Sequence, residues 1–269
     1  MTAPATTAET VNAQRSQLTQ RLITMLGVLF AGMGSWRDAD ADRFAAQAAP
    51  LVAGAQQTLA RLVALSLALQ AGMATGQTVA PPVLSNAAIS NLRPVSGREV
   101  YRRPFRHVWA ALAEGKSLRE ALQQGQSRLA EIAEGDMQLA YAHANREGMQ
   151  ALPQSVRPRS WRRVLQGESS CALCVLASTH RYTRGDLNPI HPNCDCTVEP
   201  IFGRDTHRVV DDAMLERLHA AVAELTGDSS RSGRGSDYRQ IQITRTHGEL
   251  GPMLARPGDR FTGPEQIPQ

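Results

Sequence analysis

The sequence predicts a mainly α-helical protein in which an N-terminal helical domain is followed by a small zinc-stapled Cys/His module. Apolar residues recur at helical spacing over most of the chain before residue 153. Aromatic residues make up only 4% of the 269 residues, so the core is expected to consist mainly of Ala, Leu and Val. Such a composition favours helices over sheets. All four cysteines lie between Cys171 and Cys196, where the helical pattern has stopped.

We expect five segments along the chain. They are a disordered N-terminus (1–10), a helical domain (11–152), the Cys/His module (153–203), an amphipathic helix (204–227), and a linker with an extended tail (228–269). Within the tail, Ile241 and Ile243 alternate with polar residues, which predicts a short strand.

Local signals divide the helical domain. Ser35 predicts a helix start, and Pro50 predicts a kink or a restart of the second helix. Ser117 and Glu120 have the spacing of a capping box, and Asp136 is expected to cap a further helix. The short connections predict that neighbouring helices pack antiparallel.

The net charge and the hydropathy pattern exclude few classes of protein, but they indicate the cellular compartment. The net charge is +4, and Lys116 is the only lysine, so the positive charge is nearly all arginine. Codon bias explains such a composition as well as phosphate binding does. The longest apolar run, 22–33, falls short of the ~20 residues of a membrane span, and no basic residue precedes an apolar run at the N-terminus. A reducing compartment is therefore expected, where cysteines are more often metal ligands than disulfide partners.

The cysteine cluster carries the chemistry. Its pattern is Cys171-x-x-Cys174, a loop of 16 residues, and His191-x-x-Cys194-x-Cys196. Two close-set ligand pairs separated by a loop suit a tetrahedral zinc ion, because each pair grips one edge of the tetrahedron. We therefore expect one structural Zn²⁺.

Five candidates compete for four positions around the metal. In one set the four cysteines bind the metal and His191 lies beside the site. In the other set His191 and Cys194 are the second pair of ligands and Cys196 stays free. Two disulfides, or a thioredoxin-like redox pair at Cys171 and Cys174, are the alternatives to zinc. Five potential ligands indicate a closed, structural site rather than a catalytic one. Such a site supplies on the order of 10 kcal/mol to fold a segment that lacks its own core.

An arginine-rich run precedes the cysteines. Arg157, Arg159, Arg162 and Arg163 surround Trp161, a pattern that fits a nucleic-acid contact. It equally fits an interdomain surface with one anchoring aromatic residue. The chain has no Gly-rich phosphate loop, no G-x-S-x-G and no H-E-x-x-H. We therefore predict no catalytic residues, no organic cofactor and no enzyme activity.

The segment from Arg163 to Cys174, together with the one from His191 to Pro200, resembles phage minor head proteins of the MuF type. Those proteins show a C-x-x-C followed by an H-P-x-C-x-C segment. The likeness is closest to versions from phages of actinobacteria. In these, segments like 101–105 (YRRPF) and 246–252 (THGELGP) flank the cysteines. Where the family often has Arg between the last two cysteines, this chain has Asp195, which makes phosphate binding by that turn less expected.

The resemblance implies a non-enzymatic minor component of the phage head that acts in head assembly next to the portal. The implied location is the capsid interior of the virion, and the host cytoplasm during assembly. The implied partners are the portal protein, the major capsid protein or both, and the packaged double-stranded DNA, with no membrane. The resemblance does not itself indicate a metal, and the zinc prediction depends on the ligand spacing alone.

A second hypothesis is a zinc-containing nucleic-acid-binding protein or a metal-dependent nuclease. A nuclease needs a His and acidic set poised on phosphate, and only His180, Asp186 and His191 lie near the cysteines. Binding of DNA by charge alone would use Arg159, Arg162 and Arg163 and would weaken steeply with salt.

Overall fold

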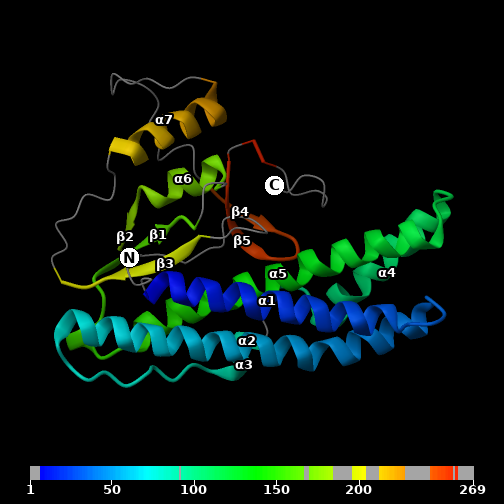
Figure 1. Cartoon of the computed structure of the whole chain (residues 1–269), viewed down its shortest axis with the longest axis horizontal. Helices are drawn as coiled ribbons and strands as arrows, with labels where there is room; N and C mark the ends of the chain where they lie inside the picture. The colour runs from blue at the N-terminus through cyan, green and yellow to red at the C-terminus, as the bar shows by residue number, and fades with distance from the viewer. Residues whose placement is uncertain are drawn as a thin grey trace, which may run out of the picture.

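Long antiparallel helices form the body of the protein in the computed structural model (Figure 1). The structure describes residues 7–90, 92–166, 170–183, 196–203, 212–227, 243–256 and 258–259. The helices of the body are α1 (Thr7–Ala31), α2 (Asp38–Thr75), α4 (Gly97–Ala113) and α5 (Leu118–Ala151), with the short α3 (Asn86–Ser90) against α2 and α5. Fully buried Phe30, Phe44 and Phe105 pack together near the turn between α1 and α2, with ring centroids 5.0–5.7 Å apart. Phe30 meets the other two rings edge to face. The mainly helical fold class is confirmed.

A smaller α/β layer lies over one end of the helical body (Figure 1). Its antiparallel sheet has the order β2-β1-β3 and is built from β1 (Ser160–Val164), β2 (Arg181–Tyr182) and β3 (Thr197–Ile201), after a 3-10 turn at Gln154–Val156. Helices α6 (Ala172–Ser178) and α7 (Asp212–Thr226) pack on each other above this sheet. A separate hairpin of β4 (Ile243–His247) and β5 (Gly251–Ala255) lies beside α5 and shares a buried cluster with it.

Several local predictions are confirmed. Ser117 Oγ accepts from the Glu120 N–H, and the Glu120 carboxylate accepts from the Ser117 N–H at 2.9 Å, which is the predicted capping box. The predicted C-terminal strand forms β4, although it begins at Ile243. Gly227, with a φ of 78°, follows α7 where the helix was expected to end. The segments 204–211 and 228–242 lie outside the described residues.

Four local predictions are wrong. Residues 7–10 belong to α1, and α2 does not restart at Pro50 but runs unbroken through it. Ser35 does not cap a helix; its N–H and hydroxyl both donate to the Asp40 carboxylate. Asp136 caps nothing, because α5 continues through it and buries its side chain.

The module has an apolar anchor, as one of the two interpretations of the arginine-rich run predicted. Val156, Trp161 and Val198 belong to the same buried cluster as the core of the helical body. Strands β1 and β3 are therefore held by the core of the body rather than by a core of their own. Helices α6 and α7 instead pack through small separate clusters, so they form the part of the module that is least tied to the body.

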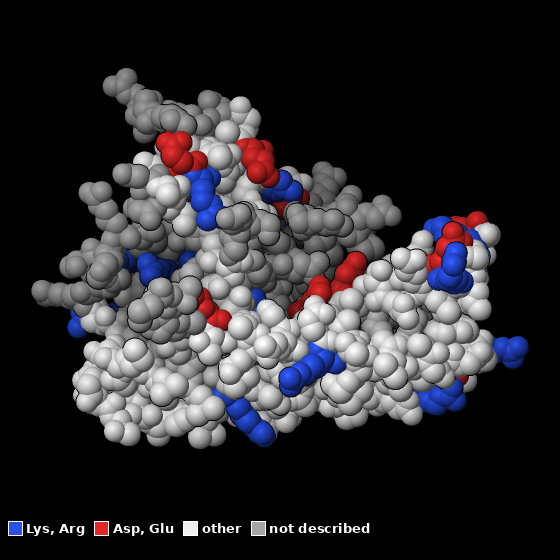
Figure 2. Space-filling view, viewed as in Figure 1, with Lys and Arg blue, Asp and Glu red and all other residues white. Residues whose placement is uncertain are grey.

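Helix α2 is the one described helix that is long and apolar enough, by length and composition, to cross a membrane. Its most apolar window has a mean hydropathy of 1.3, and 44% of that window is buried inside the protein. A core helix meets the same criterion, and α2 packs against α1, α4 and α5. Its outer face remains apolar at Leu65, Leu69 and Met73, and Figure 2 shows few charges over this part of the body.

Gly125 tests the close packing of the helical body. A methyl group there would lie 2.8 Å from Val108 Cγ2 and 2.9 Å from Phe30 Cζ. We expect Gly125→Ala to lower the free energy of unfolding by about 2 kcal/mol, because crowding outweighs the gain in helix propensity. Gly54→Ala is the matched control, because it lies inside α2 with nothing within 4 Å, and it is expected to stabilise by about 1 kcal/mol. Chemical denaturation measures both, and equal effects of the two changes would contradict the packing.

Candidate metal centre and a buried ion network

The first cysteine pair begins helix α6. Cys171 is the N-cap residue, and its Sγ accepts a hydrogen bond from the backbone N–H of Cys174 at 3.4 Å. Cys174 is buried, with 1% of its surface exposed.

Cys196 reaches the same place from the sheet. It directly precedes β3, and Arg163 on the neighbouring β1 brings Nη1 to 3.5 Å from Cys196 Sγ. Cys174 and Cys196 share one buried apolar cluster, against which Cys171 packs.

Three of the five predicted zinc ligands therefore meet in one cluster. The other two, His191 and Cys194, lie outside the described residues. Among the residues that the structure describes, no three or more His, Cys, Asp or Glu side chains are placed to hold a metal ion. Cys171, Cys174 and Cys196 share one buried cluster, but their placement does not by itself form a metal site. Cysteine sulfur is a common zinc ligand, and an ion held here would also need His191 or Cys194.

The start of β3 is clamped to the helical body. Tyr141 of α5 accepts a hydrogen bond at its hydroxyl from the Val198 N–H at 3.0 Å. Arg15 of α1 donates to the carbonyl oxygen of Cys196 at 3.4 Å, and its guanidinium lies 4.8 Å from the centroid of the Tyr141 ring. Burial raises the pKa of Tyr141, so the phenol stays neutral. These contacts fix the backbone of Cys196 independently of any metal.

The aromatic residue of the arginine-rich run is an anchor. Trp161 is 7% exposed and stacks on Tyr182, with ring centroids 4.2 Å apart and planes at 11°. Arg163 is buried beside both rings, 5.5 and 5.9 Å from their centroids. Both side chains therefore lie inside the module.

The remaining arginines of the run face outward to different degrees. Arg162 forms an ion pair with Glu199 across the strands at 2.7 Å. Arg157 donates twice to the carbonyl oxygen of Leu152, and Arg159 is exposed. Of the five residues predicted to contact a nucleic acid or partner, only Arg157 and Arg159 are exposed. Of the nuclease candidates, His180 packs edge-on against Tyr182, and Asp186 and His191 lie outside the described residues.

A buried ion network lies beside the hairpin, where the sequence indicated no site. Arg93 Nε donates to Asp136 Oδ1 at 2.7 Å, and its Nη1 donates to Glu249 Oε1 at 2.8 Å. The Asp136 carboxylate also accepts from the Tyr101 hydroxyl at 2.6 Å. The side chains of Arg93, Asp136 and Glu249 are 5–7% exposed.

Glu249 lies in the turn of the β4–β5 hairpin and joins the hairpin to three arginines of the body. Besides Arg93, it pairs with Arg103 of α4 and Arg128 of α5. Burial acts to raise the pKa of Glu249, but the three arginines outweigh it and hold that pKa below its ordinary value. Burial likewise acts to lower the pKa of Arg93, and the two carboxylates raise it above its usual value. Both shifts favour the charged forms of Glu249 and Arg93.

The network joins two segments that flank the cysteines in the sequence. Tyr101 and Arg103 belong to the segment 101–105, and Glu249 belongs to the segment 246–252. The turn is fixed further by His247 Nδ1, which accepts from the N–H groups of Glu249 and Leu250 at 3.1 Å. The segments 101–105 and 246–252 were noted in the sequence only because they flank the cysteines. No local sequence pattern could show that residues so far apart in the chain form an ion pair.

Residues 90–221 match the family model described as VG15 protein, a viral and phage protein family. The matched range spans α4, α5, the sheet, α6 and most of α7, and it includes all of the predicted zinc ligands. No curated protein and no solved structure matches the chain. The match supports a phage protein.

Glu249→Gln tests the network. A neutral side chain leaves Arg93, Arg103 and Arg128 without their shared carboxylate, so we expect the free energy of unfolding to fall by about 3 kcal/mol near neutral pH. Because the pKa of Glu249 is depressed in the folded protein, its contribution is complete above the ordinary value of 4.5 and is lost as the pH falls through the lower folded value.

The pH dependence of urea denaturation checks this prediction. The wild type should lose more stability between pH 6 and pH 3 than Glu249→Gln does, since only it carries the depressed carboxyl. Glu199→Gln, which breaks the part-exposed pair with Arg162, is the control and should cost less than about 1 kcal/mol. Parallel pH profiles for wild type and Glu249→Gln would contradict the assignment.

Proposed function

We propose that this chain is a structural minor head protein of a tailed phage, which acts in head assembly next to the portal. The observation that carries the proposal is the match of residues 90–221 to a viral and phage protein family. The MuF-type motif of the cysteine segment lies inside that range. Its flanking segments, at Tyr101 and Glu249, are held together by the ion network, which explains why both accompany the cysteines.

The proposed partners are the portal and major capsid proteins, inside the capsid of the virion. A helical body with a rigidly attached α/β layer suits a docking role, since the layer is anchored by Trp161 and by the Tyr141–Val198 hydrogen bond. Packaged double-stranded DNA is a further proposed contact, through exposed Arg157 and Arg159. The proposal includes no catalytic step.

We also propose that one zinc ion binds the cysteine cluster and holds α6 on the sheet. The gathering of Cys171, Cys174 and Cys196 in one cluster supports this assignment. Because β1 and β3 share the core of the body, zinc is needed only for the outer part of the module. This is a narrower role than folding the whole segment 153–203.

Virion composition tests the assembly role. In the phage that encodes this chain, quantitative mass spectrometry of purified virions is expected to find it in a fixed ratio to the portal protein. A phage that lacks this gene is expected to assemble defective heads. Wild-type protein supplied in trans should restore normal heads, and the Glu249→Gln variant should not. Virions and assembly intermediates that contain none of this chain would rule out the structural role.

Metal content tests the zinc assignment. Elemental analysis of protein purified under reducing conditions should give about one zinc per chain, lost in Cys174→Ser and retained in the nearby control His180→Ala. Chelation should speed hydrogen exchange in α6 and β2 while α2 and α5 stay protected, because their core does not depend on the metal. A zinc-free protein whose thiols are oxidised in pairs would refute zinc and favour disulfides.

A further inference from the structure

The turn of the β4–β5 hairpin is built on a titratable acceptor. His247 ends β4, and its Nδ1 accepts hydrogen bonds from the backbone N–H groups of Glu249 and Leu250, both at 3.1 Å. Because a backbone N–H can only donate, Nδ1 carries no proton in this arrangement and the ring is neutral. Glu249 and Leu250 are each 5% exposed, so a lost acceptor would leave both donors where water has little access.

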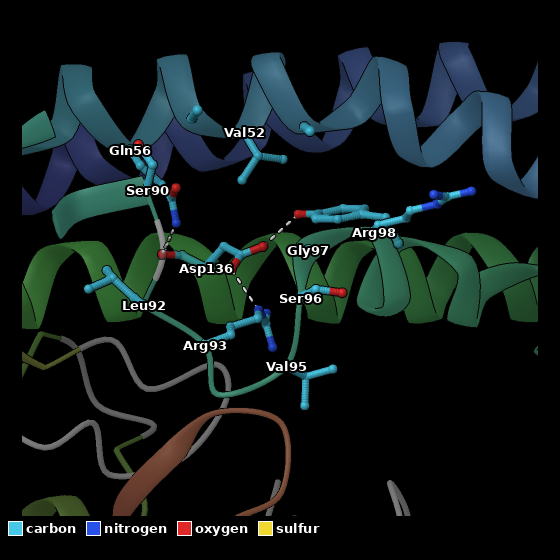
Figure 3. Close-up of a pocket in the computed structure, with 13 residues that line it drawn as sticks. Val52, Gln56, Ser90, Leu92, Arg93, Val95, Ser96, Gly97, Arg98 and Asp136 are labelled. Carbon is cyan, nitrogen blue, oxygen red and sulfur yellow. Dashed lines mark hydrogen bonds and ion pairs between the residues drawn. The ribbon is translucent and has the colours of Figure 1, made fainter. Parts of the chain in front are cut away.

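The same two residues hold the hairpin on the helical body. Leu250 packs with Leu139 of α5 in a buried cluster, and Glu249 pairs with the three arginines of the ion network. Figure 3 shows one of these arginines, Arg93, between Asp136 of α5 and the ribbon of the hairpin. The ring that accepts the two N–H groups therefore fixes the backbone of both residues whose side chains dock.

The charges that face His247 come from each element packed on the turn. They are the guanidinium groups of Arg93 in the segment before α4, Arg103 of α4 and Arg128 of α5, and the carboxylate of Glu249 in the turn itself. Arg245 lies two residues earlier in β4, and β5 carries no charged residue. Burial is the largest effect and lowers the pKa of His247; the three arginines lower it further, and Glu249 opposes them.

We propose that His247 is a pH-sensitive latch, which holds the β4–β5 hairpin on the helical body at neutral pH and releases it in mild acid. On protonation Nδ1 becomes a donor, so the N–H groups of Glu249 and Leu250 lose their acceptor. A fourth positive charge also joins the three arginines. Release uncovers these arginines together with Leu139, a surface that is closed at neutral pH. The latch depends neither on the proposed head role nor on zinc.

The latch opens on acidification. The pKa of the His247 imidazole lies below its ordinary value of 6.5 in the folded protein. The neutral ring therefore stabilises the hairpin fully above pH 6.5, and this stabilisation is lost as the pH falls through the lower folded value. Glu249 is still charged at that stage, because its own pKa is held below 4.5. Release by His247 thus precedes the loss of the Glu249 charge.

Hydrogen exchange of the full-length protein at about pH 7.5 and about pH 5, corrected for the intrinsic pH dependence of exchange, tests the latch. We expect the protection of the Glu249, Leu250 and Met253 amides to fall about fivefold to tenfold at the lower pH, while the amides of α2 keep their protection. By NMR, the Glu249 and Leu250 amide shifts should follow the titration curve of the His247 ring. A ring that titrates without moving these amides, or an equal loss of protection in α2, would contradict the latch.

Two variants separate the trigger from its surroundings. His247→Asn places an amide oxygen, which does not titrate, where Nδ1 stands, so the hairpin should be equally protected at both pH values. His107→Gln removes an imidazole of α4 whose pKa is also lowered by burial and by Arg128, and it should keep the fivefold to tenfold response of about the wild-type size. A loss of protection in His247→Asn as large as in the wild type, or no response in His107→Gln, would overturn the proposal.

Discussion

The structure depends on one buried ion pair, between Arg93 and Asp136. An arginine sealed from water is tolerable only when its charge and its donors are all matched, and here α5 supplies one carboxylate and one carbonyl oxygen while the hairpin supplies the second carboxylate. This requirement positions the segment before α4, seats the hairpin on the body and orients Tyr101 toward Asp136.

The inner and outer parts of the cysteine module are stabilised in different ways. The sheet is held by ordinary burial, with Trp161 in the common core and the start of β3 fixed by Arg15 and Tyr141. The outer helices α6 and α7 share only small clusters, and the sulfur atoms lie at their base. A metal ion in this position would join the outer helices to an already ordered sheet, so its loss would loosen the module without unfolding the body.

The sequence predicted features that depend on neighbouring residues better than contacts between residues far apart in the chain. The mainly helical fold and the capping box at Ser117 are local, and both were predicted correctly. Asp136 was misread because an acidic residue at a helix start and one buried inside a helix have the same local pattern. Its partner Arg93 lies 43 positions away, and Glu249 lies 156 positions from Arg93, so no periodicity links them. The spacing of the cysteines predicted that they would meet, and Cys171, Cys174 and Cys196 do share one cluster. The arginine-rich run left two interpretations of Trp161 open, and only the structure decides for the anchor.

Because Glu249 lies near the C-terminal end of the sequence, the ion network can form only after the helices of the body have been synthesised. As the chain leaves the ribosome, Arg93, Arg103 and Arg128 emerge long before the carboxylate that neutralises them. Until the hairpin arrives, Arg93 and Arg128 have only Asp136 and Glu131 of α5 as carboxylate partners, and the contacts of all three arginines with Glu249 are missing. A nascent or truncated polypeptide would therefore present an open, positively charged flank, and only the full-length product could close it.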